Sequence, residues 1–432
     1  MPKSVQSTGI DRLLILELIA KCMFISGKIN LSSLSSRLKL SINVLNEVLG
    51  FMVAEKMAEV VRRGASDVDV EYQLSTAGKQ RAAEFMTSCR YVGPAPVTLE
   101  AYRRMVEKHS VRGTHVVQQD MASAFSDLNL NSTIRDQIGA AMNSGRPLFL
   151  YGPPGSGKTY IAEKLGRLMQ GLVPVPYAIT VENEIIQVFD PLVHHPVNIE
   201  PSHDSIDRQA YDGRWLLCER PVVLTGGELT LEMLELRYDY HTGFYQAPPH
   251  FKANNGIFIV DDLGRQQVKP KDLMNRWIVP LDRGCDYLTL HTGYKFVAPF
   301  DLSVIFSTNI HPAELADEAF MRRLGYKIHI GPLSEEEYRN VFRQHSYALG
   351  INYDEAAFRY LVDDLHAKNS RPLLACYPRD LLNQITDYAR FYSEPRVMCP
   401  QALKRVWHTY FAQNDNLAKL KDKGMEWQPA EN

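Results

Sequence analysis

One short stretch constrains the fold of this chain more than any other. Residues 148–165 read LFLYGPPGSGKTYIAEKL, an apolar run followed by a glycine-rich turn, a Lys-Thr pair and a helical pattern. Glycines let successive backbone N–H groups curve around an anion, and the N-terminus of the next helix carries positive dipole charge. The pattern G-x-x-x-x-G-K-S/T is fitted without a mismatch by Gly152, Gly155, Gly157, Lys158 and Thr159. The stretch therefore predicts a phosphate-binding loop between a strand and a helix.

This loop is the expected binding site for the phosphates of ATP. Lys158 is expected to neutralise charge on the β- and γ-phosphates, and Thr159 is expected to bind Mg²⁺. The alternative is a tight strand-to-helix turn with an incidental lysine, which the full match and its setting disfavour. The residues expected to contact the nucleotide are Gly152, Pro153, Pro154, Gly155, Ser156, Gly157, Lys158, Thr159 and Tyr160.

A second apolar strand pattern ends in two acids. Residues 254–266 read NNGIFIVDDLGRQ, and ligands of parallel sheets lie at the carboxyl ends of strands. Asp261 is expected to hold Mg²⁺ together with Thr159, and Asp262 to orient and partly deprotonate the attacking water. With the glycine loop, these acids form a Walker A and Walker B pair. The alternative is an acidic turn after a core strand.

A third apolar run, DLSVIFSTNIHP, ends in Ser307, Thr308 and Asn309. If the run is a strand of the same sheet, the amide of Asn309 is expected beside the γ-phosphate or the attacking water.

The pattern along the chain divides it into four segments. The 432 residues, 45% hydrophobic and 23% charged, are enough for two or three globular domains. Strand-like and helix-like runs alternate over residues 125–332, which predicts an α/β core with a parallel sheet. Residues 333–432 have a helical pattern, which predicts a helical lid and tail. Residues 91–124 are expected to form a linker, and residues 1–90 a separate domain.

The order of these motifs resembles that of the AAA+ ATPases. The resemblance implies that Asn309 is sensor 1, Arg323 the arginine finger and Arg379, in the stretch CYPRDLL, the sensor 2 arginine of the lid. An arginine finger stabilises transition-state charge on the ATP of the neighbouring subunit. The resemblance therefore implies a homo-oligomeric ring, which we expect to be hexameric. The alternative for Arg322 and Arg323, each taken singly, is a solvated helix face.

A narrower resemblance is to MoxR-like ATPases. Residues 286–309 are similar to their hairpin and strand before sensor 1, and residues 261–284, which include Arg265, to their stretch after Walker B. The resemblance covers residues 128–388. It includes a longer insert than usual, residues 190–255, for which the sequence suggests no mechanism.

The chain departs from the family pattern at the Walker B motif. The usual form ends in Asp-Glu, whereas this chain has Asp261-Asp262. The expected water activator is therefore one methylene shorter. A misplacement of about 1 Å can cost on the order of a hundredfold in rate, so we expect slow hydrolysis.

The N-terminal segment predicts helices and a hairpin in the order of a winged helix-turn-helix domain. Its presumptive recognition helix, residues 41–56, carries Glu47 and Glu55 against the single Lys56. A helix that reads a DNA groove normally presents several Arg, Lys, Asn or Gln side chains. Docking to protein, or packing on the chain's own ring, is therefore favoured over DNA binding. A winged helix before such a core is similar to bacterial ATPases of predicted chaperone-like activity.

These observations leave three functions open. The favoured one is a ring ATPase that couples hydrolysis of ATP to remodelling of an unidentified protein partner, with residues 190–255 and 288–300 as candidate partner loops. The second is a DNA-associated regulator or motor. The third is a nucleotide-gated scaffold with little turnover.

Other features of the sequence bear on location and metals. No apolar run reaches the roughly 20 residues that span a bilayer, and no signal-peptide pattern opens the chain, so we expect a cytoplasmic protein without membrane insertion. The six cysteines are scattered and are expected to be reduced thiols. His194 and His195 are expected to be an exposed loop pair and not metal ligands.

Overall fold

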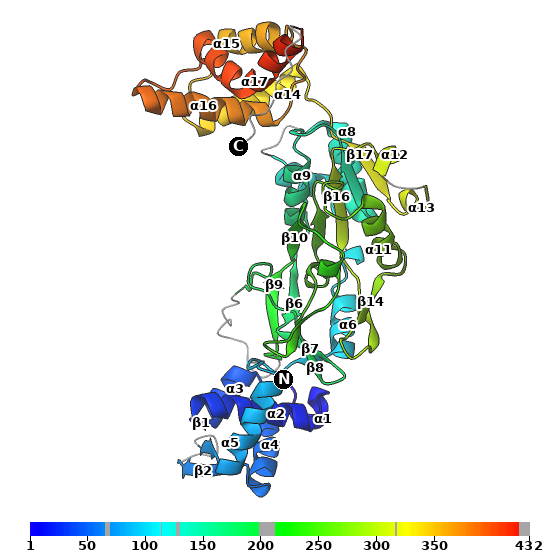
Figure 1. Ribbon diagram of the computed structural model, residues 1–432, viewed down its shortest axis with the longest axis vertical. Coiled ribbons are helices and arrows are strands. Elements are labelled where there is room, and N and C mark those ends of the chain that lie inside the picture. Colours follow the sequence, from blue (N-terminus) through cyan, green and yellow to red (C-terminus); the bar gives the residue numbers. More distant parts are fainter. Residues whose placement is uncertain (65–69, 114, 127–129, 198–211, 316–317, 423–432) are drawn as a thin grey trace. The chain divides into compact units, whose positions relative to one another are not determined.

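The structure is a computed structural model that describes residues 1–64, 70–113, 115–126, 130–197, 212–315 and 318–422. It divides into two compact units. Figure 1 draws their helices and strands. One unit comprises Met1–Val117, Gly139–Phe149 and Ala162–Lys327. The other comprises Gln118–Ile138, Leu150–Ile161 and the chain from Ile328 onward.

The first unit begins with helices packed on a small antiparallel sheet. The helices start at capping side chains: Asp11, Asn30, Ser41 and Ser75 each accept a hydrogen bond from a backbone N–H of the first turn. Their apolar faces enclose a core that includes Ile15, Leu34 and Leu49. The strand order is β1-β3-β2. The elements are α1 (Val5–Thr8), α2 (Arg12–Ser26), β1 (Lys28–Asn30), α3 (Leu31–Leu38), α4 (Ile42–Ala54), β2 (Ala58–Arg63), β3 (Val70–Leu74) and α5 (Thr76–Ser88).

A second sheet follows in the same unit. It has five strands, in the order β11-β12-β8-β7-β4. Its strands are β4 (Val97–Thr98), β7 (Ala178–Val181), β8 (Glu184–Gln187), β11 (Arg237–Asp239) and β12 (Phe244–Gln246). Helix α6 (Leu99–Lys108) buries Tyr102 and Val106 in the core of this sheet. A two-stranded sheet pairs β6 (Leu172–Pro176) with β9 (Trp215–Glu219).

This second sheet changes the expected division of the chain. Residues 91–124 were expected to form a linker, but they supply β4 and α6, because Val97 and the inner face of α6 are apolar and buried. The described part of residues 190–255, expected as a partner loop, supplies β9, β11 and β12 and part of the large parallel sheet. Sequence patterns do not show with which strands such short segments pair, so the second sheet was not predicted.

The N-terminal helices pack against this second sheet. Ala178 and Ile185, from β7 and β8, belong to the same apolar core as the helices. Arg214 is 5% exposed and donates from Nη1 to the carbonyls of Thr8, at 3.1 Å, and Pro96, at 3.2 Å. The segment expected as an insert therefore forms part of the support for the N-terminal helices.

The large sheet confirms the predicted α/β fold class. Its strand order is β10-β13-β16-β5-β17. Strands β10, β13 and β16 run parallel, with Val260 paired to Thr225 on one side and Phe306 on the other. All four residues of β13 are buried, as expected for a strand covered on both faces. The strands are β5 (Leu148–Tyr151), β10 (Val222–Thr225), β13 (Ile257–Val260), β16 (Ser303–Thr308) and β17 (Tyr326–His329).

The chain segments before, between and after these strands form helices and a hairpin (Figure 1). The hairpin pairs β14 (Cys285–Thr289) with β15 (Lys295–Pro299). The helices are α7 (Gln118–Ala124), α8 (Ser132–Ser144), α9 (Lys158–Leu165), α10 (Pro249–Lys252), α11 (Pro270–Arg283), α12 (Pro312–Leu315) and α13 (Glu318–Met321). Short 3₁₀ turns span Val111–Gly113, Gly166–Leu168 and Glu232–Leu234.

The C-terminal helices of the second unit form a core of their own. The first of them begins with a capping box in which the Ser334 and Glu337 side chains bind each other's backbone N–H. Their shared core includes Tyr338, Leu381 and Trp407. The helices are α14 (Glu335–Ala348), α15 (Glu355–Arg359), which continues as a π-helix over Tyr360–His366, α16 (Cys376–Tyr392) and α17 (Pro400–Asp422).

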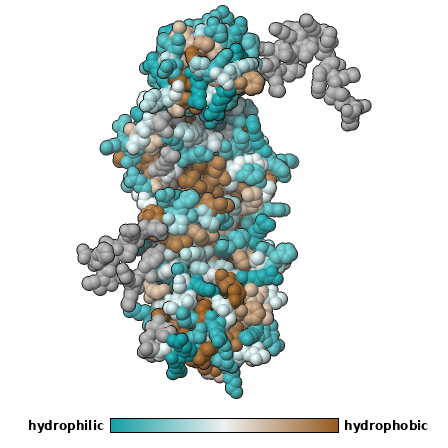
Figure 2. All heavy atoms as spheres, turned by 90° about the vertical axis from the view of Figure 1, so that its left-hand side faces the viewer, coloured by the Kyte–Doolittle hydropathy of each residue, from teal (hydrophilic) through white to brown (hydrophobic). Residues whose placement is uncertain are grey.

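On the face drawn in Figure 2, hydrophobic residues gather in separate groups among hydrophilic ones. Among the residues that the structure describes, no helix has both the length and the apolar composition needed to cross a membrane.

Candidate functional site

The phosphate loop lies in the second unit, between β5 and α9. Gly152, Gly155 and Gly157 have φ of 149°, 81° and 93°, in the region that favours glycine. A Cβ on Gly152 would lie 2.1 Å from the carbonyl oxygen of Ile330. A Cβ on Gly155 would lie 2.5 Å from the Sγ atom of Cys376. Both glycines are therefore required by the packing of the loop as well as by its backbone angles.

The ammonium group of Lys158 lies inside the curve of this loop. Lys158 is 6% exposed, and its Nζ atom donates to the carbonyls of Gly152, at 3.0 Å, and Pro153, at 2.9 Å. It also lies 3.5 Å from the Ser156 hydroxyl. Thr159 is half-buried, whereas Tyr160 is 45% exposed. The loop thus holds a positive charge beside its own backbone, as an anion-binding loop requires.

The N-terminus of α16 packs on the same loop. The backbone N–H of Cys376 donates to the carbonyl of Gly155 at 3.1 Å. The Cβ atom of Ala375 lies 3.8 Å from the position of a Cβ on Gly157. Arg379, three residues into the helix, is 63% exposed at its side chain and donates from Nε to Asp380 at 3.1 Å. The C-terminal helices are therefore anchored directly to the phosphate loop.

The two acids lie in the first unit, at the carboxyl ends of β10, β13 and β16. The backbone N–H of Asp261 donates to the carbonyl of Thr225, the last residue of β10, at 2.7 Å. The hydroxyl of Thr308 donates to the carbonyl of Leu263 at 2.6 Å. These bonds tie the loop after β13 to the ends of both neighbouring strands.

Asp262 and Asn309 are brought together by this arrangement. The Asn309 amide donates to Oδ1 of Asp262 at 3.2 Å, and Arg265 lies 3.6 Å from Oδ2. Asp262 has φ of 49°, a left-handed angle that costs a non-glycine residue roughly 1 kcal/mol. The sequence predicted that Asp262 would orient the attacking water and that Asn309 would lie beside the γ-phosphate or that water, but it indicated neither their bond nor the left-handed backbone.

A residue that the motifs did not indicate lies under this loop. Gln266 is 8% exposed, and its side-chain amide bonds to three backbone groups around the acids. The sequence stretch after the acids includes Gln266 without giving it a role, so only its burial and its bonds reveal it.

Arg323 is bound within its own chain. Its Nε donates to the Asp282 carboxylate, in the last turn of α11, at 2.7 Å, and the two side chains are 29% and 43% exposed. Helix α13 ends at Met321, so Arg323 follows the helix in the chain.

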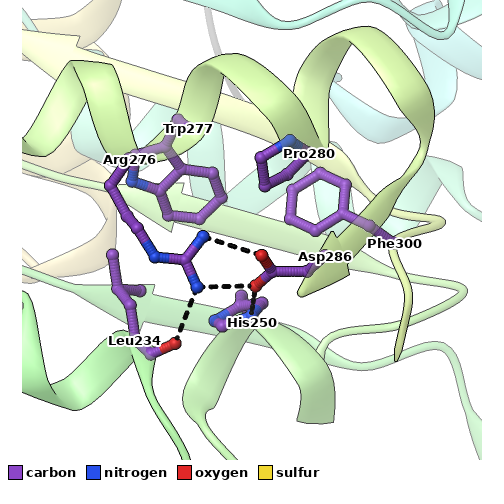
Figure 3. A pocket seen from close by; sticks show the side chains of 7 residues that line it. All are labelled: Leu234, His250, Arg276, Trp277, Pro280, Asp286 and Phe300. Atoms are coloured by element: carbon purple, nitrogen blue, oxygen red, sulfur yellow. Dashed lines mark hydrogen bonds and ion pairs between the residues drawn. The ribbon is translucent and has the colours of Figure 1, made fainter. Parts of the chain in front are cut away.

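A buried charge cluster ties the β14–β15 hairpin to the helices (Figure 3). Asp286, at the start of β14, accepts from His250 at 2.9 Å and from both Nη atoms of Arg276, at 2.7 and 2.9 Å. Burial raises the pKa of Asp286, but the bonds from His250 and Arg276 outweigh it and lower that pKa to about 2. Leu234, Trp277, Pro280 and Phe300 close the crevice around these groups, which leaves no space for a water molecule.

The expectation that His194 is exposed is wrong. His194 is 1% exposed, its Nδ1 accepts from the Asp190 N–H at 2.9 Å, and its Nε2 donates to the carbonyl of Lys252 at 2.9 Å. Burial lowers the pKa of the imidazole. Both ring nitrogens of His194 form hydrogen bonds with backbone groups. The role of this histidine is therefore structural.

Comparison with known proteins gives limited matches. Residues 334–409, in the C-terminal helices, match a family described as a domain of unknown function, DUF8689. No curated protein matches the chain in sequence.

Two solved structures are similar in fold. Thermotoga maritima RuvB, a Holliday junction branch migration motor, is 11% identical, with a TM-score of 0.35 over 69% of this chain and 72% of its own. Brucella abortus NtrX is 14% identical, with a TM-score of 0.39 over 76% of this chain and 66% of its own. Likeness at this level does not extend beyond the general α/β architecture.

Proposed function

We propose that the chain is a magnesium-dependent AAA+ ATPase that binds ATP at the loop after β5 and hydrolyses it. One observation carries this proposal: a buried Lys158 inside a loop of three left-handed glycines follows a strand of a parallel sheet. Two other strands of that sheet, β13 and β16, are followed directly by Asp261 and Asp262 and by Asn309. The order of these motifs along the chain implies that the loop and the acids would act on one nucleotide.

The residues fit Mg²⁺ chemically. Asp261 and Thr159 offer carboxylate and hydroxyl oxygens, the donors that Mg²⁺ prefers. When bound, the ion would neutralise charge on the β- and γ-phosphates. Gly152 has a φ of 149° and no room for a side chain, so only glycine fits this position of the phosphate loop. Lys158 would exchange loop carbonyls for phosphate oxygens.

Asp262 would activate the attacking water, with Asn309 holding its carboxylate. The short side chain and the nearby Arg265 both favour slow turnover, because the carboxylate is held back and partly neutralised. A nucleotide-gated scaffold with little turnover is therefore the second candidate function.

Arg323 would act as a finger on the ATP of the next subunit in a ring, and Arg379 would contact ATP from the lid. To do so, Arg323 must break its ion pair with Asp282. This pair is partly exposed and therefore of modest strength. We infer that a hexameric ring remodels a protein partner. Exposed side chains of the hairpin, Tyr287 and Tyr294, support a partner surface there.

DNA binding through α4 has less support. Helix α1 lies at the N-terminal half of α4, where Ser41 donates to the carbonyl of Pro2 at 2.6 Å and Glu47 accepts from the Val5 N–H at 3.2 Å. This end of the helix is therefore engaged by the chain itself.

Phosphate release tests the proposal. The parent protein with ATP and Mg²⁺ is compared with Lys158→Ala, which removes the loop cation. We expect release from the parent and background release from the variant. Equal rates would refute the proposed hydrolysis of ATP. The affinity for ATP, measured by calorimetry, would then distinguish a nucleotide-gated scaffold from a chain that does not bind nucleotide.

A further inference from the structure

A buried glutamine bonds to the loop that carries the two acids. The Oε1 atom of Gln266 accepts from the Gly264 N–H at 2.8 Å. Its Nε2 atom donates to the carbonyls of Asp261, at 3.1 Å, and Gly226, at 3.2 Å. One side-chain amide thus uses its acceptor and both donors on backbone groups.

Two of these bonds flank Asp262. One fixes the residue before it, Asp261, and another fixes Gly264, two residues after it. The enclosed backbone is unusual, since φ is 49° at Asp262 and 105° at Gly264. Such angles persist where surrounding bonds hold the backbone.

The third bond connects this loop to the neighbouring strand. Gly226 follows β10 directly, and β10 pairs with β13 in parallel. Gln266 therefore fixes the acid loop relative to the sheet as well as to itself.

The position of the Asp262 carboxylate depends closely on this backbone. An aspartate has only two side-chain torsions, so its carboxylate follows the backbone more strictly than that of a glutamate would. Asn309 and Arg265 interact with the oxygens of the Asp262 carboxylate. They can do so only if the backbone of the loop places this carboxylate within their reach.

We propose that Gln266 is a positioning residue for hydrolysis: it sets the left-handed turn that aims the Asp262 carboxylate at the attacking water. This inference rests on the proposed ATPase function. The acceptor and both donors of Gln266 are used on backbone groups, so its loss should affect the chemical step and leave nucleotide binding intact.

The test compares Gln266→Met with the parent and with Gln267→Met. Methionine keeps the length of the side chain and removes every hydrogen bond. Gln267 is the adjacent glutamine and is exposed, which makes it a matched control. We expect kcat of Gln266→Met to fall about tenfold or more, with KM and ATP affinity within about twofold of the parent. Gln267→Met should behave as the parent.

A second variant separates positioning from folding. Gln266→Glu keeps the acceptor for Gly264 and loses both donors, and it should also lower kcat. Parent-like kcat in both folded variants would overturn the proposal. So would an equal loss of ATP affinity and turnover, or loss of the folded state in both variants by circular dichroism, since each indicates a purely structural role. If parent and Lys158→Ala release phosphate equally, the ATPase proposal itself fails.

Discussion

Several ionisable side chains of the proposed site are held by neighbours in their own chain. Lys158 bonds to loop carbonyls, and Asp262 bonds to Asn309. Lys158 must exchange these carbonyls for phosphate oxygens when ATP binds. Part of the binding free energy would therefore be used to rearrange the site, which agrees with slow turnover.

Gly152→Ala tests the geometry of the phosphate loop. A Cβ there would lie 2.1 Å from the Ile330 carbonyl, so the loop must shift. We expect ATP affinity, measured by calorimetry, to fall about tenfold or more. Gly171→Ala is the matched control, because Gly171 also has a positive φ, of 94°, but a Cβ there would meet nothing within 4 Å. Equal affinity in both variants would contradict the loop assignment.

Asp262→Asn tests the water activator. The amide keeps the shape and loses the base, so ATP affinity should stay within about twofold while the rate of phosphate release falls about a hundredfold. Single-turnover measurements with saturating protein separate chemistry from binding. A variant as fast as the parent would remove Asp262 from this role.

Elements of the first unit are joined by charged side chains as well as by apolar packing. Arg276 of α11 bonds to Asp286 of β14, and the same helix carries Asp282, the partner of Arg323. Helix α11 therefore contacts both the hairpin and the proposed arginine finger. A shift of α11 would therefore move its contacts with both the hairpin and Arg323.

The Asp286 cluster predicts a stability effect that depends on pH. The pKa of Asp286 lies at about 2, below its ordinary value of 3.8, so its contribution of about 2 kcal/mol is present above pH 4 and lost as pH falls towards 2. Asp286→Asn should lower the urea midpoint at pH 7 and lessen its decline over this acid range. Asp387→Asn, at an exposed site on α16, should change neither. Identical acid profiles for parent and Asp286→Asn would contradict the assignment.

At the scale of the whole molecule, the proposed ATPase site would be completed by a second copy of the chain. Arg323 lies outside the loop and acid motifs and bonds to Asp282 of α11. A ring would offer each Arg323 a neighbouring ATP. Nucleotide would then control assembly, and mass in solution with a slowly hydrolysed ATP analogue would report it.

Mixing two inactive variants tests action between subunits. Arg323→Ala should lower turnover by roughly a hundredfold or more with ATP still bound. In mixed assemblies, Lys158→Ala subunits supply intact Arg323 to the ATP of Arg323→Ala subunits, so some phosphate release should return. The control is each variant diluted with buffer in place of the other variant. No recovery would indicate a residue that acts within its own chain, or not at all.

Local sequence determined the chemistry of the site. The phosphate loop, the two acids and Asn309 each follow an apolar run, and short-range chemistry requires glycine, lysine and carboxylate at fixed spacings. The α/β core was also predictable from its alternating strand-like and helix-like runs, and the C-terminal helices from their helical periodicity.

Tertiary structure decided what joins these parts. The bonds of Gln266 to Gly226, of Arg323 to Asp282 and of Arg214 to Thr8 link residues 40, 41 and 206 positions apart. The placement of β4, β9, β11 and β12 in their sheets likewise depends on partners elsewhere in the chain. No local pattern specifies such pairs, because a buried polar group is satisfied by whichever backbone the fold brings to it.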